Sequence, residues 1–269
     1  MNNLNFTKNR ELSTESHCLS PEREEQIIGS LHHQIEGLHE KIAVQDAAIS
    51  KLHQWAKDPI SWRQEQVDCV QDFLECSERF RSIQGWLNDR EGYGLLLLAC
   101  NGPCHGAIVE LGSFMGRSTA FLATGSQRSK RERVVAIDHF KGSPEHQPGA
   151  SHAVPEIVAH GTTLHQFVAN ISALGLVDQV EAIIASAEEA VTTWKRPIRL
   201  LFMDADHSYE TSKRDFESWS PFIVPGGVVC FHDINQWEGV TRFYSELLAS
   251  TTEYREIAII DSIRVIQRL

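Results

Sequence analysis

Short apolar runs alternate with longer amphipathic stretches through the second half of the chain, and this alternation limits the fold more than any other feature. Residues 107–111 and 198–204, for example, are apolar without a period of two, as strands covered on both faces are. Parallel strands need a crossover connection, which is usually a helix. Seven strands are expected, at 107–111, 133–138, 180–184, 198–204, 227–232, 255–260 and 263–268.

The last two of these runs flank Asp261-Ser262, a tight turn, so they should pair antiparallel. The sequence therefore predicts an α/β, Rossmann-like, seven-stranded, mostly parallel sheet with a C-terminal antiparallel hairpin. We assign residues 106–269 to this domain and residues 58–105 to a helical extension of it. Within the extension, Asn88 followed by Glu91 has the spacing of a capping box and predicts a helix start.

A heptad pattern precedes the extension and predicts a coiled-coil helix over residues 21–57. Its a and d positions are Ile28, Leu31, Ile35, Leu38, Ile42, Gln45, Ile49 and Leu52. Isoleucine at a with leucine at d favours a parallel two-stranded coil, so we expect a homo-oligomer formed through residues 22–57. Packing of this helix on its own domain is the alternative. Residues 1–20 are polar and are expected to be a disordered tail.

The first expected strand runs into Glu110-Leu-Gly-Ser-Phe-Met-Gly-Arg-Ser-Thr119, a loop that opens the next helix. Gly112 and Gly116 allow a sharp turn and a close approach to a ligand, and the helix start offers unpaired N–H groups. Asp138 ends the second strand about twenty residues further on, where a carboxylate can accept hydrogen bonds from both ribose hydroxyls. Together these features predict a site for a ligand with a nucleoside part.

Acidic and imidazole side chains follow the fourth and fifth expected strands. They are Asp204, Asp206, His207, His232 and Asp233. Because the carboxyl ends of parallel strands form one crevice, these side chains should come together. Such a group suits a divalent cation or a general base acting on a hydroxyl. Some members can instead cap a helix, as Asp206 and Ser208 would for a helix beginning near Glu210.

Four segments resemble the class I S-adenosylmethionine-dependent methyltransferases, and most of all the branch of macrocin-type sugar O-methyltransferases and cephalosporin-hydroxylase-like proteins. They are residues 110–119, 138–146, 200–209 and 225–233, within a resemblance that covers roughly residues 80–269. Asp-x-Asp-His-Ser-Tyr followed by Pro-Gly-Gly and His-Asp is specific to this branch, whereas the glycine loop is not. Phe114 stands where the loop usually has its central glycine.

The resemblance implies S-adenosylmethionine as the cofactor and methyl transfer to a hydroxyl of a sugar or small natural product. It implies that the cofactor is held by Glu110, Gly112, Ser113, Gly116, Ser118, Asp138, Ser186, Ala187 and Asp204. In metal-using relatives magnesium is held at the positions of Asp204, His232 and Asp233. A histidine there weakens the expectation of Mg²⁺ or another divalent cation, because hard cations prefer oxygen ligands.

Catalysis is expected from His207, His232 and Asp204, with either histidine as the base. His207 also has a structural alternative, as the anchor of the loop after the fourth strand. Residues 141–159 form a long connection that is expected to fold over the site as a mobile lid. Trp237 is expected to add an apolar wall.

Charge and composition narrow the range of partners. A net charge of −11 disfavours nucleic acid as a partner and speaks against an RNA methyltransferase. The apolar runs are too short for a bilayer and the N-terminus does not resemble a secretory signal, so we expect a cytoplasmic protein that acts on a small molecule. The six cysteines lack the paired spacing of a zinc site. The alternative function is a catalytically silent nucleoside-binding scaffold that oligomerises through its coil.

Overall fold

A computed structural model of the chain describes residues 28–29, 31–32, 34–39, 42, 45–46, 59–102 and 104–269. It divides into two compact units, Met1–Cys69 and Val70–Leu269. In the first unit, the described heptad positions are helical, and their aliphatic side chains are exposed, from 47% at Ile35 to 55% at Leu38. The heptad positions from residue 49 onward and the expected tail at 1–20 lie outside the described residues, so the coiled coil stays a prediction.

Two helices precede the first strand. α2 spans Pro59–Phe80. It begins at a proline, which is favoured there because backbone N–H groups in the first turn of a helix have no intrahelical acceptor. α3 spans Asp89–Asn101 and begins with the predicted capping box. The Asn88 side chain accepts from the Glu91 backbone N–H at 3.0 Å, and the Glu91 carboxylate accepts from the Asn88 backbone N–H at 3.1 Å. Gly102 follows the helix as its C-cap.

The sheet has seven strands in the order β3-β2-β1-β4-β5-β7-β6. Their bounds are β1 Ala107–Leu111, β2 Val134–Asp138, β3 Val180–Ile184, β4 Ile198–Met203, β5 Ile223–Phe231, β6 Tyr254–Ile260 and β7 Ile263–Arg268. Strands β1 to β5 pair in parallel, while β7 pairs antiparallel with both β5 and β6. The predicted fold class is therefore confirmed.

Strand β5 begins at Ile223, earlier than the expected residue 227. The pairing of β4 with β5 shifts register between Ile198 and Leu200, and the extra residues of β5 at this irregularity include Pro225 and Gly226. A proline has no N–H to donate to a ladder and is tolerated where pairing is irregular. Pro225 and Gly226 are local turn signals, which explains why the strand expected from the sequence begins only at residue 227.

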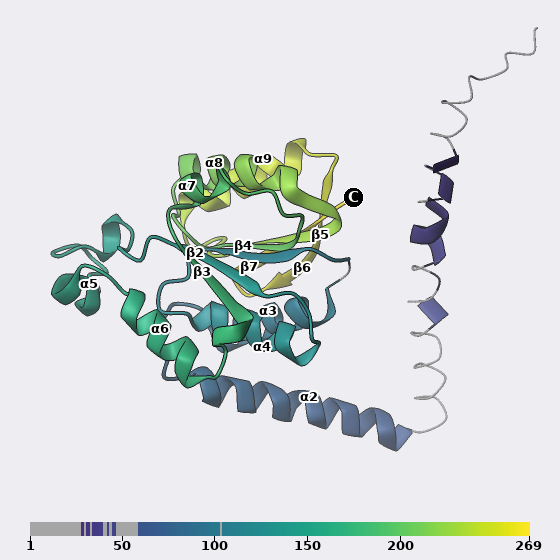
Figure 1. Ribbon diagram of the computed structural model, residues 1–269, viewed down its shortest axis with the longest axis horizontal. Helices are drawn as coiled ribbons and strands as arrows, with labels where there is room; N and C mark the ends of the chain where they lie inside the picture. Colours follow the sequence, from purple (N-terminus) through teal and green to yellow (C-terminus); the bar gives the residue numbers. More distant parts are fainter. Residues whose placement is uncertain are drawn as a thin grey trace, which may run out of the picture. The chain divides into compact units, whose positions relative to one another are not determined.

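Helices cover both faces of the sheet (Figure 1). α3 and α4 (Arg117–Arg128) lie on one face, and α7 (Ala187–Val191), α8 (Tyr209–Trp219) and α9 (Glu238–Ser250) lie on the other. The remaining helical segments are η1 Pro144–His146, α5 Pro155–His160, α6 Leu164–Ala173, η2 Val177–Gln179 and η3 Ser220–Phe222. One buried cluster centres on Phe80 and Phe121, and the other on Phe216 and Trp219. None of the helices in the described part of the chain has the length and apolar character that a bilayer crossing requires.

Two glycines bring neighbouring segments against the loop that follows β4. A Cβ atom on Gly112, which has φ +87°, would lie 2.2 Å from the backbone oxygen of Asp204. A Cβ atom on Gly239, near the start of α9, would lie 2.4 Å from the backbone oxygen of His207. Such distances are far below van der Waals contact, so only glycine lets these backbones meet. The loop from Asp204 to His207 is thereby fixed from two sides.

Candidate active site

A cavity of about 420 Å³ lies at the carboxyl ends of β1, β2 and β4, within the size range of small-molecule sites. Among its lining residues are these members of the predicted cofactor set: Gly112, Ser113, Ser118, Asp138, Ser186, Ala187 and Asp204. His207 and Asp233 line it too, whereas Glu110, Gly116 and His232 do not. Most of the candidate residues identified from the sequence therefore line this one cavity.

The carboxylate of Asp138 shapes the glycine loop. Its Oδ2 accepts hydrogen bonds from the backbone N–H groups of Ser113 and Phe114, both at 2.8 Å, and its Oδ1 accepts from Phe140 at 2.6 Å. Phe114 has φ +47°, a strained value for a residue with a side chain, and the two loop hydrogen bonds hold it there. A carboxylate has about four acceptor positions, so one remains for a further donor from the cavity.

Glu110 lies behind the loop and is fully buried. Its Oε2 accepts from the hydroxyls of Ser113 at 2.8 Å and Thr119 at 2.5 Å, while Oε1 has no hydrogen-bond partner among the described residues. Burial raises the pKa of Glu110 to about 7, although hydrogen bonds from Ser118, Thr119 and Ser113 act in the opposite direction. Glu110 therefore orders the loop from behind, and the cofactor contact expected of it stays a prediction.

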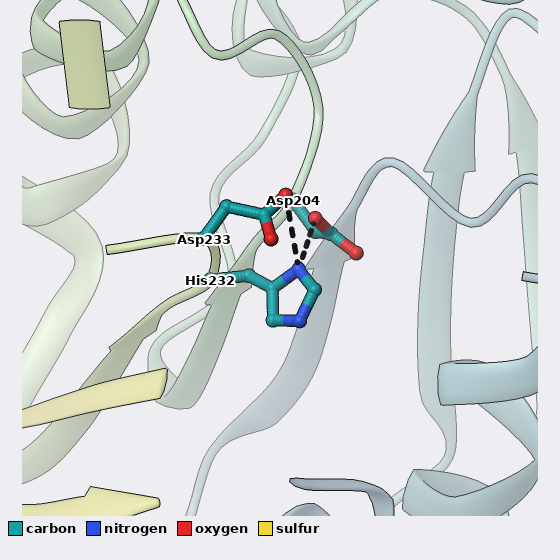
Figure 2. A group of neighbouring side chains, drawn as sticks. All are labelled: Asp204, His232 and Asp233. Carbon is teal, nitrogen blue, oxygen red and sulfur yellow. Dashed lines mark hydrogen bonds and ion pairs between the residues drawn. The ribbon is translucent and has the colours of Figure 1, made fainter. Parts of the chain in front are cut away.

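Nδ1 of His232 faces the carboxylates of Asp204 and Asp233 (Figure 2). Its Nδ1 is 2.9 Å from Asp204 Oδ1 and 3.4 Å from Asp233 Oδ2, and its Nε2 is 3.3 Å from Glu91 Oε2. Burial disfavours the charged ring, but the attraction of Asp204 and the hydrogen bonds to Asp204, Asp233 and Glu91 outweigh it and raise the pKa of His232 to about 12. The His232 side chain is 2% exposed.

His207 lines the cavity and contacts the same Asp233 oxygen that faces His232. Its Nε2 is 2.9 Å from Asp233 Oδ2, and its ring stacks on Trp237 with centroids 4.8 Å apart and planes 11° apart. Burial would raise the pKa of Asp233, but hydrogen bonds from His207 and His232 hold it well below its usual range. The ring of His207 is therefore fixed by a carboxylate at its edge and an indole on its face.

Asp206 and Ser208 have the capping role that the sequence offered as an alternative. Ser208 is the N-cap of α8, with its hydroxyl accepting from the Thr211 backbone N–H at 3.3 Å. Asp206 Oδ1 accepts from the Ser208 backbone N–H at 2.7 Å. Asp206 lines the cavity while holding the turn that leads into α8.

Residues 109–234 match the sequence model of a family described as a methyltransferase domain. This match covers the glycine loop, Asp138, Asp204 and the His232-Asp233 pair. Over these residues the chain is similar to a methyltransferase domain. The resemblance to S-adenosylmethionine-dependent methyltransferases is thereby confirmed.

Individual proteins are similar to this chain in sequence or in fold. The uncharacterized protein y4gI of Sinorhizobium fredii is 42% identical over 146 residues, which are 53% of this chain and 15% of that protein. The chain thus spans only a small part of this curated relative. The O-methyltransferase NovP has 20% identity and a TM-score of 0.53, over 67% of this chain and 80% of its own. A Bacillus cereus O-methyltransferase in complex with SAH has 19% identity and a TM-score of 0.51, over 75% and 90%. At these identities the two structures show the fold.

Two residues of the site, Trp86 and Glu91, could not be identified as site residues from the sequence. Trp86, in the loop between α2 and α3, lines the cavity and stacks on His146 with ring centroids 4.7 Å apart and planes 10° apart. Glu91 was recognised only as a helix cap. The exposure of Trp86 is visible only in the structure, and the contact of Glu91 with His232 leaves no local signal in the sequence. The expected lid contributes Gly142, Ser143, Pro144, His146 and His152 to the lining.

The raised pKa of Glu110 predicts a pH-dependent stability. Folding raises this pKa from 4.5 to about 7, so the contribution is fully present below pH 4.5 and is lost as pH rises through about 7. Glu110→Gln keeps the shape and cannot ionise. Between pH 4.5 and pH 8, we expect the free energy of unfolding of the variant to rise relative to that of the wild type by up to about 3 kcal/mol. Urea unfolding at several pH values measures the difference; a constant difference would contradict the assignment.

Proposed function

We propose that this chain is an S-adenosylmethionine-dependent O-methyltransferase that acts on a hydroxyl of a sugar or another small natural product. The observation that carries the proposal is the gathering of Gly112, Asp138, Ser186 and Asp204, from four separate connections, around one cavity. S-adenosylmethionine supplies an already activated methyl group on a sulfonium. The protein therefore has two tasks, to align the acceptor oxygen with that methyl group and to remove its proton.

The chemistry of the lining suits this cofactor. Asp138 retains an acceptor position for a ribose hydroxyl after binding the loop and Phe140. Ser186 and Ala187, at the start of α7, lie where the resemblance implies an adenine contact. Asp204 places a carboxylate in the wall, where a cationic sulfonium is attracted. These contacts support the proposed cofactor.

We assign the base to His207. Of the two histidines expected in this role, His207 lines the cavity, while His232 lies beneath Asp204 with both ring nitrogens facing carboxylates. When Nε2 donates to Asp233, the neutral His207 ring carries its lone pair on Nδ1, which is the tautomer that a base needs. Asp233 then orients the ring and stabilises its charged form after proton transfer.

Flat aromatic surfaces support a ring-shaped acceptor. The Trp86–His146 pair and the Trp237–His207 pair both line the cavity, and the two rings of each pair are stacked with nearly parallel planes. An indole face binds either an aromatic ring or the C–H face of a sugar. His152, from the expected lid, also approaches Trp237, with centroids 6.3 Å apart. The two indoles and the lid histidines are therefore the proposed acceptor walls.

Charge in the lining supports a neutral or cationic acceptor. The ionisable acids of the lining are Asp138, Asp204, Asp206, Asp215 and Asp233. Arg117 donates to three backbone carbonyls and one carboxylate, and Arg214 pairs with Glu188 and Asp215. The two lining arginines thus already have partners, and a phosphate or carboxylate on the acceptor would meet acidic neighbours.

We also propose that residues 22–57 join two copies of the chain as a parallel coiled coil. The heptad pattern supports it, as do the exposed aliphatic side chains at the described a and d positions. The domain boundaries at residues 58 and 106 and a cytoplasmic location remain predictions. In the alternative, the silent scaffold, the cofactor would bind without turnover.

Cofactor binding is the first test. Calorimetry should show that the wild type binds S-adenosylmethionine and that Asp138→Ala weakens binding by at least about tenfold, because a charge-assisted contact and the loop geometry are both lost. Asp178→Ala is the matched control, since it removes an exposed carboxylate after α6 and should leave affinity unchanged. Absence of binding by the wild type at millimolar cofactor would overturn the proposed function.

Turnover is the second test. Neutral hydroxylated rings, both phenols and sugars, are screened with detection of S-adenosylhomocysteine. With an accepted substrate, His207→Gln should lower kcat by about 10² to 10⁴, the usual contribution of a general base, without changing cofactor affinity. His165→Gln removes an exposed histidine of α6 as the control. Equal losses in both variants would argue against His207 as the base, and binding without any turnover would favour the scaffold.

Assembly is tested separately by sedimentation. Leu38→Lys puts a charge at a d position. Because a buried lysine opposes coil formation, the mass measured by sedimentation should fall to that of one chain. Glu36→Gln, at an adjacent b position, should leave the mass unchanged. A monomeric wild type would contradict the coiled coil, and a Leu38→Lys variant that remains a dimer would place the interface elsewhere.

A further inference from the structure

Three carboxylates from three different elements surround the ring of His232. Asp204 follows β4 and Asp233 follows His232 at the end of β5, and both face Nδ1; Glu91 belongs to α3 and faces Nε2. A neutral imidazole has one N–H and one lone pair, so either tautomer would direct a lone pair at a carboxylate oxygen. Only the imidazolium donates from both nitrogens. The geometry is therefore that of a buried cation with its counter-ions in place.

The same atoms have the grouping of a metal site. One ligand atom each from Asp204, His232 and Asp233 lie within 4.8 Å of one another. A histidine binds a metal through a ring lone pair, so the ring must be neutral at the nitrogen that faces the metal. Here Nδ1 is at hydrogen-bond distance from Asp204 Oδ1, and magnesium favours an octahedral set of oxygens. The donor set does not fit a hard divalent cation.

We propose that the protonated ring of His232 occupies the place of a metal ion in this site, and that Glu91 is the positioning residue that keeps it there. The inference rests on the proposed methyl-transfer site, but it concerns the state of His232, which exists before any ligand binds. His232 offsets the charge of Asp204 and Asp233, and its hydrogen bond fixes the Asp204 carboxylate at the cavity wall. His207 is the remaining titratable neighbour, 2.9 Å from Asp233 and 4.0 Å from Asp204.

Glu91 is held firmly enough to serve as the anchor. Its side chain is 2% exposed, and its Oε1 accepts from the Ser262 backbone N–H at 2.8 Å and from the Ser262 hydroxyl at 2.6 Å. Its Oε2 accepts from the Asn88 backbone N–H at 3.1 Å while facing His232. Burial opposes ionisation, but His232, Ser262 and Asn88 together lower the pKa of Glu91. An ionised carboxylate is thus fixed against Nε2.

The experiment reads the protonation of His232 directly in the full chain without cofactor, by ¹⁵N NMR of histidine-labelled protein. In the wild type, both ring nitrogens should remain protonated from about pH 6 to about pH 9, where an ordinary histidine is neutral or becomes so. Glu91→Gln removes one counter-ion at nearly constant shape, and the His232 signal should then titrate within that range. His232→Gln identifies the signal by its loss.

Asn88→Ala is the matched control, because it removes the other half of the capping box and leaves the Glu91 contact with His232 in place. It should lower the melting temperature without moving the His232 signal, which separates a positioning role from a structural one. An unchanged His232 signal in folded Glu91→Gln would overturn the role of Glu91. If that variant does not fold, the wild-type spectrum and the metal titration decide the proposal.

Magnesium and manganese chlorides are titrated into the wild type by calorimetry, and NMR is repeated with magnesium. We expect no binding at millimolar metal and no shift of His232. Saturable binding that deprotonates Nδ1 would overturn the proposal, as would a neutral His232 ring near pH 7. Loss of S-adenosylmethionine binding would count against the proposed function alone, since none of these readings uses the cofactor.

Discussion

The carboxylate of Asp138 holds the turn on which the proposed cofactor side of the cavity depends. Its two hydrogen bonds to the loop after β1 keep Phe114 in a left-handed conformation, and the loop then opens α4. Hydrogen bonds to an ionised acceptor are about twice as strong as neutral ones, which suits a strained turn. Gly112 brings the same loop against the Asp204 backbone. The Asp138 side chain at the end of β2 therefore fixes the loop after β1, and Gly112 of that loop lies against the segment after β4.

Much of the fold was predictable because buried parallel strands carry their own local signal. The strands at Ala107–Leu111, Val180–Ile184 and Ile263–Arg268 have the expected bounds, since their apolar runs end at turn residues. Asp138 and Asp204 were predictable as neighbours because strand ends share an edge. β5 was misjudged at its start, because the register shift that admits Pro225 arises from pairing with β4 and not from β5 itself.

The remainder of the site depends on contacts between distant residues, which periodicity does not encode. Glu91 has the spacing of a helix cap whether or not it touches His232, and Trp86 looks like any exposed loop residue. Both lie before the segment that matches the methyltransferase family at 109–234. The matched segment thus contains the proposed cofactor loop and the proposed base, while residues before it contribute a proposed acceptor wall and the proposed anchor of the buried cation.

The hydrogen bond between Glu91 and the Ser262 backbone joins residues 171 positions apart, and this separation orders events during translation. Most of the cavity's residues leave the ribosome well before the turn between β6 and β7 exists. Until Ser262 emerges, the Glu91 carboxylate lacks the two donors that fix its Oε1, and β5 lacks its antiparallel neighbour. Closing so long a loop is slow. In a nascent chain the loop after β1 can therefore form before Glu91 gains these contacts, and a fragment limited to residues 109–234 would lack both Glu91 and Ser262.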